Sequence, residues 1–174
     1  MVKYLFPDVD NTSLTEFLRV FRREYDGYDH LDVVWHDGVV EGLADLYNYY
    51  PECIYVVTNK PTFPTASIVK SAGLSAYFKS IVGIDYRKLL LGETLFADKA
   101  EAIHFTLGLA TCKPEQVIYI GDTPADRESS SKCGVSFIAA TYGFYRWHQN
   151  EFAAAPSASC FMDVVELINR FKRK

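Results

Sequence analysis

Two aspartates spaced one residue apart follow a short apolar run near the start of the sequence, in the stretch KYLFPDVDNTS. Asp8 and Asp10 come after Pro7, a residue that cannot donate a backbone hydrogen bond inside a strand. By themselves, these turn-forming residues would indicate a loop. More polar residues follow later apolar runs, namely Thr58 and Asn59 after CIYVV, and Asp122 and Asp126 after VIYIG.

Carboxylates gathered at one edge of a sheet repel each other unless a divalent cation with oxygen ligands lies among them. Lys99 follows Asp98 at the start of a predicted helix, and a lysine beside such a cation commonly contacts a phosphoryl group. Hydroxyl and backbone N–H groups after a strand can bind the phosphoryl oxygens. These residue types therefore predict a site that holds a metal ion and attacks a phosphate.

Alternating strands and helices would bring these residues to the same edge. Continuous apolar runs predict strands at 4–6, 53–57, 80–84, 117–121 and 135–140. Apolar spacing and capping residues predict helices that begin at Ser13, Asp37, about 64, Asp98, about 124 and Ser159. The alternation predicts a three-layer α/β fold with a doubly wound parallel sheet, in which ligands bind beyond the carboxyl ends of the strands.

Composition favours one domain over residues 1–174, because a 49% hydrophobic chain of this length supports a single core of ordinary size. The net charge of -4 and a basic excess confined to NRFKRK argue against nucleic-acid binding. No apolar leader is visible, and no apolar run approaches the roughly 20 residues of a membrane span, so we expect a cytoplasmic protein. Without C-x-x-C spacing we expect reduced core cysteines at Cys53, Cys112, Cys133 and Cys160.

The polar motifs resemble those of the haloacid dehalogenase (HAD) superfamily, and in particular its phosphoglycolate-phosphatase-like hydrolases. The D-x-D-x-T motif matches DVDNT, the strand-ending threonine matches VVTNKP, the motif lysine matches Lys99, and G-D-x-x-x-D matches GDTPAD. The matches occur in the family's order over residues 8–126. The resemblance implies a HAD-like fold and a Mg²⁺-dependent phosphatase that hydrolyses phosphate monoesters through an aspartyl-phosphate.

The resemblance also implies roles for single residues. Asp8 would be the nucleophile, and Asp10 would be the general acid and base. Thr58 would hydrogen-bond the transferring phosphoryl group, and Lys99 would neutralise its charge. The implied phosphate-binding residues are Asn11, Thr12, Thr58, Asn59 and Lys99. The implied Mg²⁺ ligands are Asp8, the Asp10 backbone carbonyl and Asp122, with Asp126 in support.

The sequence departs from the family pattern in three places. At position 7 the family usually has an apolar residue whose backbone carries an N–H group, whereas this sequence has Pro7, which has none. The proline that often follows the motif lysine is missing after Lys99, and Lys88 is a rival, although Lys99 is preferred because it starts the helix before strand 117–121. Only a short segment at about 13–36 stands where many relatives insert a cap domain. This predicts a site that the chain itself leaves open. Either a bulky phosphorylated substrate or a neighbouring subunit would then cover it.

Other functions stay open at this point. A phosphomutase of the same superfamily would need cap residues, which we do not expect in this chain. A receiver-like phosphoacceptor domain would signal without turnover, but it normally has adjacent acids after its first strand and its acceptor aspartate after its third. A true haloacid dehalogenase has no use for an acid at position 10 or for Mg²⁺. The spacing of Asp8 and Asp10 therefore favours a phosphatase.

Overall fold

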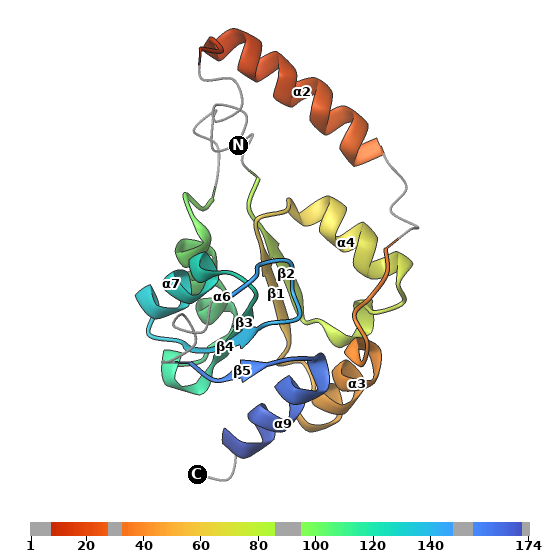
Figure 1. Cartoon of the computed structure of the whole chain (residues 1–174), viewed down its shortest axis with the longest axis vertical. Coiled ribbons are helices and arrows are strands. Elements are labelled where there is room, and N and C mark those ends of the chain that lie inside the picture. Colours follow the sequence, from red (N-terminus) through yellow and green to blue (C-terminus); the bar gives the residue numbers. More distant parts are fainter. Residues whose placement is uncertain (1–7, 28–32, 86–94, 148–154, 172–174) are drawn as a thin grey trace. The chain divides into compact units, whose positions relative to one another are not determined.

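The computed structural model of the chain describes residues 8–27, 33–85, 95–147 and 155–171 (Figure 1). The chain forms two compact units, Met1–Asp32 and Val33–Lys174. The predicted strand at 4–6 and the rival lysine Lys88 lie outside the described residues. A single domain with a residual cap at about 13–36 stays a prediction. Among the described residues, no helix is both long and apolar enough to cross a membrane.

The first unit contains helix α2 (Asn11–Gly27). The prediction that Ser13 caps this helix is wrong, because Asp10 precedes the first helical residue and takes that role. The Ser13 N–H donates to Asp10 Oδ1 at 2.9 Å, and the Ser13 hydroxyl donates to Oδ2 at 2.6 Å. A carboxylate at this position satisfies a backbone donor that has no partner inside the helix. On the apolar side, Phe17 and Phe21 stack with 6.2 Å between ring centroids.

The second unit alternates helices and strands, as the apolar periodicity predicts. Its first half contains α3 (Val39–Tyr49), β1 (Tyr55–Thr58), α4 (Thr62–Ser71), the 3₁₀ helix η2 (Ser75–Tyr77) and β2 (Ser80–Gly83). Its second half contains α6 (Lys99–Ala110), the 3₁₀ helix η3 (Pro114–Gln116), β3 (Ile118–Gly121), α7 (Pro124–Lys132), β4 (Ser136–Ala140), β5 (Ser157–Ala158) and α9 (Phe161–Phe171).

All described strand pairs are parallel. Strand β1 pairs with β2, and Thr58 lies opposite Gly83 at the end of that ladder. Strands β3, β4 and β5 form a second ladder in that order, in which Gly121 lies opposite Ala139. Four predicted strands are confirmed as β1 to β4 with small shifts at their ends. Strand β5 was not predicted, because two residues are too few to show a period.

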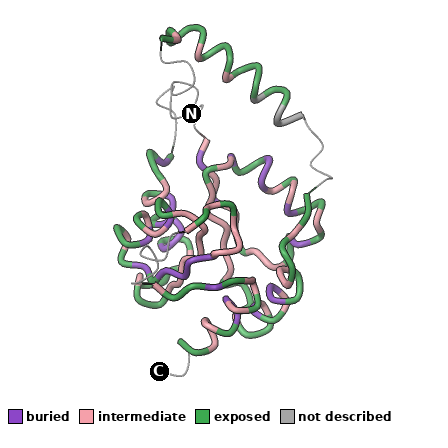
Figure 2. Tube along the Cα trace, viewed as in Figure 1, coloured by how far each residue is buried: buried purple, intermediate pink, exposed green. Residues whose placement is uncertain are grey.

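Helices cover both faces of the strands, which confirms the predicted α/β architecture (Figure 1). Helix α6 packs on one face, where its residues Ile103 and Leu107 contact Val135 and half-buried strand residues. Helix α9 packs on the other face, where Val164 contacts Ile138. Leu43 of α3 and Val69 of α4 belong to one buried cluster, which also includes strand residues and Phe161 of α9. The buried residues concentrate in these elements, while outer helix faces are exposed (Figure 2).

The ends of the helices show which capping predictions hold. The Asp98 side chain accepts from Glu101 N–H at 2.9 Å and caps α6 as predicted. Asp37 does not cap α3, because Gly38 occupies the N-cap position with φ +77° and Asp37 lies one residue too early. The cysteines are all free, but Cys53 and Cys112 are exposed, so the prediction that all four lie in the core is wrong.

Candidate active site

A buried ion pair lies where α6 and α7 begin. Lys99 is the first residue of α6, and its Nζ contacts Oδ1 of Asp126 in the first turn of α7. The two side chains are 16% and 4% exposed. Charges so poorly hydrated depend on each other, because removing one partner leaves the other desolvated and unpaired. The fold thereby places one lysine ammonium next to the β3–α7 turn.

The other oxygen of the Asp126 carboxylate is held by the turn that precedes α7. The Thr123 hydroxyl donates to Asp126 Oδ2 at 2.7 Å, and the Thr123 N–H donates to the same oxygen at 3.1 Å. In return, Asp126 N–H donates to Thr123 Oγ1 at 3.2 Å, which completes a capping box. Gly121 allows this close approach, since a Cβ there would lie 2.4 Å from Asp126 Cβ. Asp126 is therefore rigidly held.

Asp122 follows the last residue of β3 and lies under the loop that follows β4. The backbone N–H of Phe144 donates to Asp122 Oδ2 at 3.1 Å. A Cβ on Gly143 would lie 2.3 Å from the Cβ of Asp122, so only glycine permits this contact without a shift. The carboxylate is therefore held from one side by backbone and is half-buried.

Tyr119 links the two ladders from inside the fold. Its hydroxyl donates to the carbonyl oxygen of Val57 in β1 over a long 3.4 Å, and its ring stacks on Phe137 with 6.4 Å between centroids. Burial is the largest cause that raises the pKa of Tyr119, and the negative charges of Asp126 and Asp122 raise it further. The phenol therefore keeps its proton at neutral pH. Sequence reasoning missed this residue. Its only signal is its place in VIYIG, two residues before Gly121.

Thr58 ends β1 beside that carbonyl. The Lys60 N–H donates to Thr58 Oγ1 at 3.1 Å, and the Ile84 N–H donates to Thr58 O at 3.0 Å. The turn after β1 is held further by Gly83, whose N–H donates to Thr62 Oγ1 at 3.0 Å. The hydroxyl of Thr58 is thus fixed at a strand end, as predicted. Asn59 is exposed.

The predicted residues of the first unit lie at the start of α2. Asp8, Asp10, Asn11 and Thr12 are all exposed. Hydrogen bonds from the Ser13 hydroxyl and then the Ser13 N–H lower the pKa of Asp10 below its usual value of 3.8. In the second unit, Lys99 and Asp126 pair directly, Asp122 directly follows β3, and Thr58 ends β1.

The donor atoms at the second unit's strand ends are oxygens, which suit a hard divalent cation. Both oxygens of Asp126 are engaged by Lys99 and Thr123, so Asp122 is the carboxylate of that cluster whose chemistry fits a metal ion. Within the described ranges, no three His, Cys, Asp or Glu side chains form a ligand cluster. A complete set of metal ligands would therefore need oxygens from beyond this cluster.

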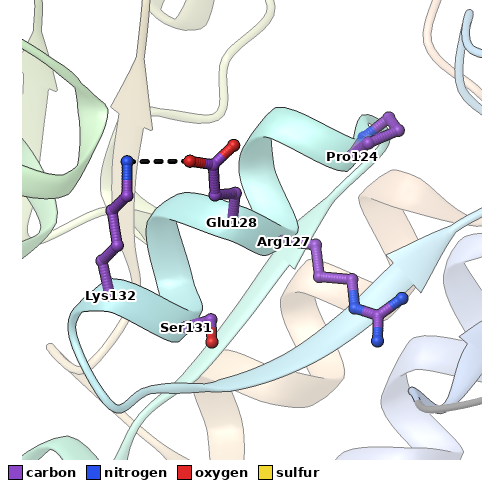
Figure 3. A pocket seen from close by; sticks show the side chains of 5 residues that line it. All are labelled: Pro124, Arg127, Glu128, Ser131 and Lys132. Atoms are coloured by element: carbon purple, nitrogen blue, oxygen red, sulfur yellow. Dashed lines mark ion pairs between the residues drawn. The ribbon is translucent and has the colours of Figure 1, made fainter.

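A pocket lies along α7 and is lined by none of the predicted site residues (Figure 3). Its lining residues all come from one helix, and they are Pro124, Arg127, Glu128, Ser131 and Lys132. Lys132 Nζ lies 2.8 Å from Glu128 Oε1, one turn away on the same helix. Both side chains are more than half exposed, so this ion pair contributes little to stability.

The fold and the four motifs agree with a known family. The chain belongs to the haloacid dehalogenase-like hydrolase family, whose sequence model matches residues 1–140. A phosphoglycolate phosphatase of Pseudomonas syringae is 28% identical over 162 residues, which cover 92% of this chain and 55% of that protein. A phosphoglycolate phosphatase of Colwellia psychrerythraea is 26% identical over 169 residues, covering 95% of this chain and 70% of that protein. The chain spans about half the length of the Pseudomonas relative.

Solved structures share the fold. The crystal structure of a predicted phosphatase from Clostridium acetobutylicum superposes with a TM-score of 0.81 and 23% identity, over 97% of this chain and 76% of that one. This similarity confirms the HAD-like α/β fold.

Proposed function

We propose that the chain is a Mg²⁺-dependent phosphatase that hydrolyses phosphate monoesters through an aspartyl-phosphate on Asp8. The observation that carries this proposal is the buried Lys99–Asp126 pair beside Asp122, because it fixes a cation next to a carboxylate at the strand ends. Membership of the haloacid dehalogenase-like hydrolase family and similarity to phosphoglycolate phosphatases support it. A cytoplasmic location stays a prediction from the sequence.

Two displacements make up the proposed reaction. In the first, a carboxylate oxygen of Asp8 forms a bond to phosphorus while the bond from phosphorus to the ester oxygen breaks, and Asp10 gives its proton to the departing alkoxide. In the second, Asp10 takes a proton from water as the water oxygen attacks the aspartyl-phosphate. Inorganic phosphate leaves, and the carboxylate of Asp8 is restored.

The remaining residues of the proposed site stabilise charge. Lys99 and the Thr58 hydroxyl face the transferring phosphoryl group, and Asp126 acts through Lys99 by fixing its ammonium. Donors for the phosphoryl oxygens come also from Asn11, Thr12 and Asn59. Asp8, the Asp10 backbone carbonyl and Asp122 would hold Mg²⁺, which when bound neutralises negative charge on the phosphoryl oxygens. Asp126 supports this set indirectly, since both its oxygens are engaged.

Removal of divalent metal should abolish hydrolysis, because the proposed ligands are all oxygens and their charges need a hard cation. Phosphate release is measured after treatment with EDTA and after gel filtration into buffers with Mg²⁺ or Zn²⁺. We expect activity near background without metal and recovery with Mg²⁺. Recovery with Zn²⁺ while Mg²⁺ has no effect would contradict the proposed ligand set.

Asp10→Asn should lower kcat on the order of 10²- to 10⁴-fold for esters of poor leaving groups, because general acid catalysis is lost. The loss should be much smaller for p-nitrophenyl phosphate, whose leaving group needs little protonation. Asparagine caps helices as well as aspartate does, so the variant keeps the cap of α2. Circular dichroism checks this. An equal loss for good and poor leaving groups would contradict the acid role of Asp10.

Screening the purified chain against a panel of phosphate esters with Mg²⁺ tests the proposed function directly. Many turnovers with release of inorganic phosphate are expected. Phosphorylation that stops after one equivalent would indicate a receiver-like phosphoacceptor, and transfer to a second site of a sugar phosphate would indicate a phosphomutase.

A further inference from the structure

One aromatic side chain beside Asp122 is almost fully in solvent. Phe144 is 96% exposed. The other three aromatic residues of the loop 141–147 are half-buried and take part in ring contacts. Tyr145 meets Trp147 edge to face at 5.3 Å, and Tyr142 meets His36 in the same way at 5.2 Å. The loop therefore folds by packing its other rings and leaves Phe144 outside.

The backbone fixes where this exposed ring starts. The Phe144 N–H donates to Asp122 Oδ2 at 3.1 Å, and Gly143 packs directly on the Cβ of Asp122. The Cβ of Phe144 is two bonds from that nitrogen, so the side chain begins within a few ångströms of the carboxylate. Asp122 is one of the proposed Mg²⁺ ligands, so this ring begins next to the metal position of the proposed site. Phe144 thus lies at the rim of the proposed site.

An exposed phenylalanine gains free energy when something covers it. Burial removes the apolar surface of the ring from water, and pairing with another aromatic ring adds a favourable stacked or edge-to-face contact. A small charged leaving group such as glycolate offers no surface for this gain, whereas a planar ring does. The chemistry of the rim therefore favours leaving groups that carry an aromatic ring.

We propose that Phe144 determines specificity by stacking on the leaving group, and that the preferred substrates are phosphate monoesters with an aromatic ring close to the ester oxygen. The proposal rests on the proposed phosphatase function and names the substrate class of that same site. It also gives a chemical class to the bulky substrate predicted from the sequence, because the aromatic ring of the leaving group would itself cover this side of the site.

The test compares three phosphate esters of alkyl alcohols, so that leaving-group acidity does not dominate. Benzyl phosphate carries an aromatic ring, cyclohexylmethyl phosphate has similar bulk without aromaticity, and phosphoglycolate is small and charged. Values of kcat and KM are measured with Mg²⁺ for the wild type, Phe144→Ala and Phe144→Leu. Phe63→Ala is the matched control, because Phe63 is 77% exposed at the start of α4 and is not among the proposed site residues.

We expect wild-type kcat/KM to be highest for benzyl phosphate. Phe144→Ala should lower that value about 5- to 10-fold, mainly by raising KM, while phosphoglycolate changes less than about twofold. Phe144→Leu should restore part of the loss for cyclohexylmethyl phosphate and less for benzyl phosphate. Phe63→Ala should change none of these values.

A wild type that prefers phosphoglycolate, or an equal loss for all three esters in Phe144→Ala, overturns this inference. In both cases the proposed phosphatase function survives, because turnover is still observed. If the wild type hydrolyses none of the esters with Mg²⁺, the proposed function fails and the inference fails with it. Equal melting temperatures of wild type and Phe144→Ala, expected for a side chain with little contact, exclude unfolding as a cause.

Discussion

Replacing Asp8 with asparagine is expected to abolish turnover while leaving the fold intact. An amide is a poor nucleophile and a poor metal ligand, yet it has nearly the shape of the carboxylate. Loss of a covalent nucleophile lowers kcat by about four orders of magnitude or more. Release of inorganic phosphate measures the activity, and circular dichroism measures the helical content. Because Asp8 is exposed, its replacement leaves no buried group unpaired.

Asp45→Asn is the matched control for Asp8→Asn. Asp45 is exposed on α3, and its substitution makes the same chemical change at a position outside the proposed site. Activity of this variant should equal that of the wild type. A folded, uncontaminated Asp8→Asn sample with full phosphatase activity would refute the assignment of the nucleophile.

Lys99→Met should weaken both stability and catalysis. The change removes the cation that pairs with buried Asp126, and breaking a buried pair in this way costs about 3–5 kcal/mol of unfolding free energy. Loss of the charge facing the phosphoryl group should lower kcat by about 10²- to 10³-fold. Urea unfolding measures the first effect, and phosphate release measures the second under conditions where the variant is folded.

A comparison of two lysines separates these effects from general loss of charge. Lys132→Met removes the exposed Lys132–Glu128 pair of α7 and should cost at most about 1 kcal/mol without loss of activity. The double change Lys99→Met with Asp126→Asn should regain much of the stability, because no buried charge is left unpaired, but none of the activity. Equal effects of Lys99→Met and Lys132→Met would show that the buried pair has no special role.

The sequence by itself determined the order and type of most elements of the second unit. Hydrophobic period, continuous apolar runs and the cap of α6 depend on neighbouring residues, so they are visible in a single chain. The motif positions followed for the same reason, since the polar residues stand directly after the runs that form β1 and β3. The sequence motifs alone therefore indicated the family, and the match to the family model confirms it.

Local patterns decided less at the helix starts. Ser13 and Asp37 both fit a capping signal, yet Asp10 caps α2 and Gly38 precedes α3. Several residues within a few positions can cap, and the path of the preceding chain selects among them.

Only the tertiary structure showed how distant residues act on one another. It pairs Asp126 with Lys99, 27 positions earlier, so one oxygen of the Asp126 carboxylate is engaged by an ammonium group. It also set Tyr119 against Val57 and placed the Phe144 amide on Asp122, 22 positions earlier. These contacts arise when strands and helices pack, because packing brings together side chains whose separation along the chain carries no local signal. The need for glycine at position 143 has the same origin, because Gly143 packs against Asp122, which lies 21 residues earlier in the sequence.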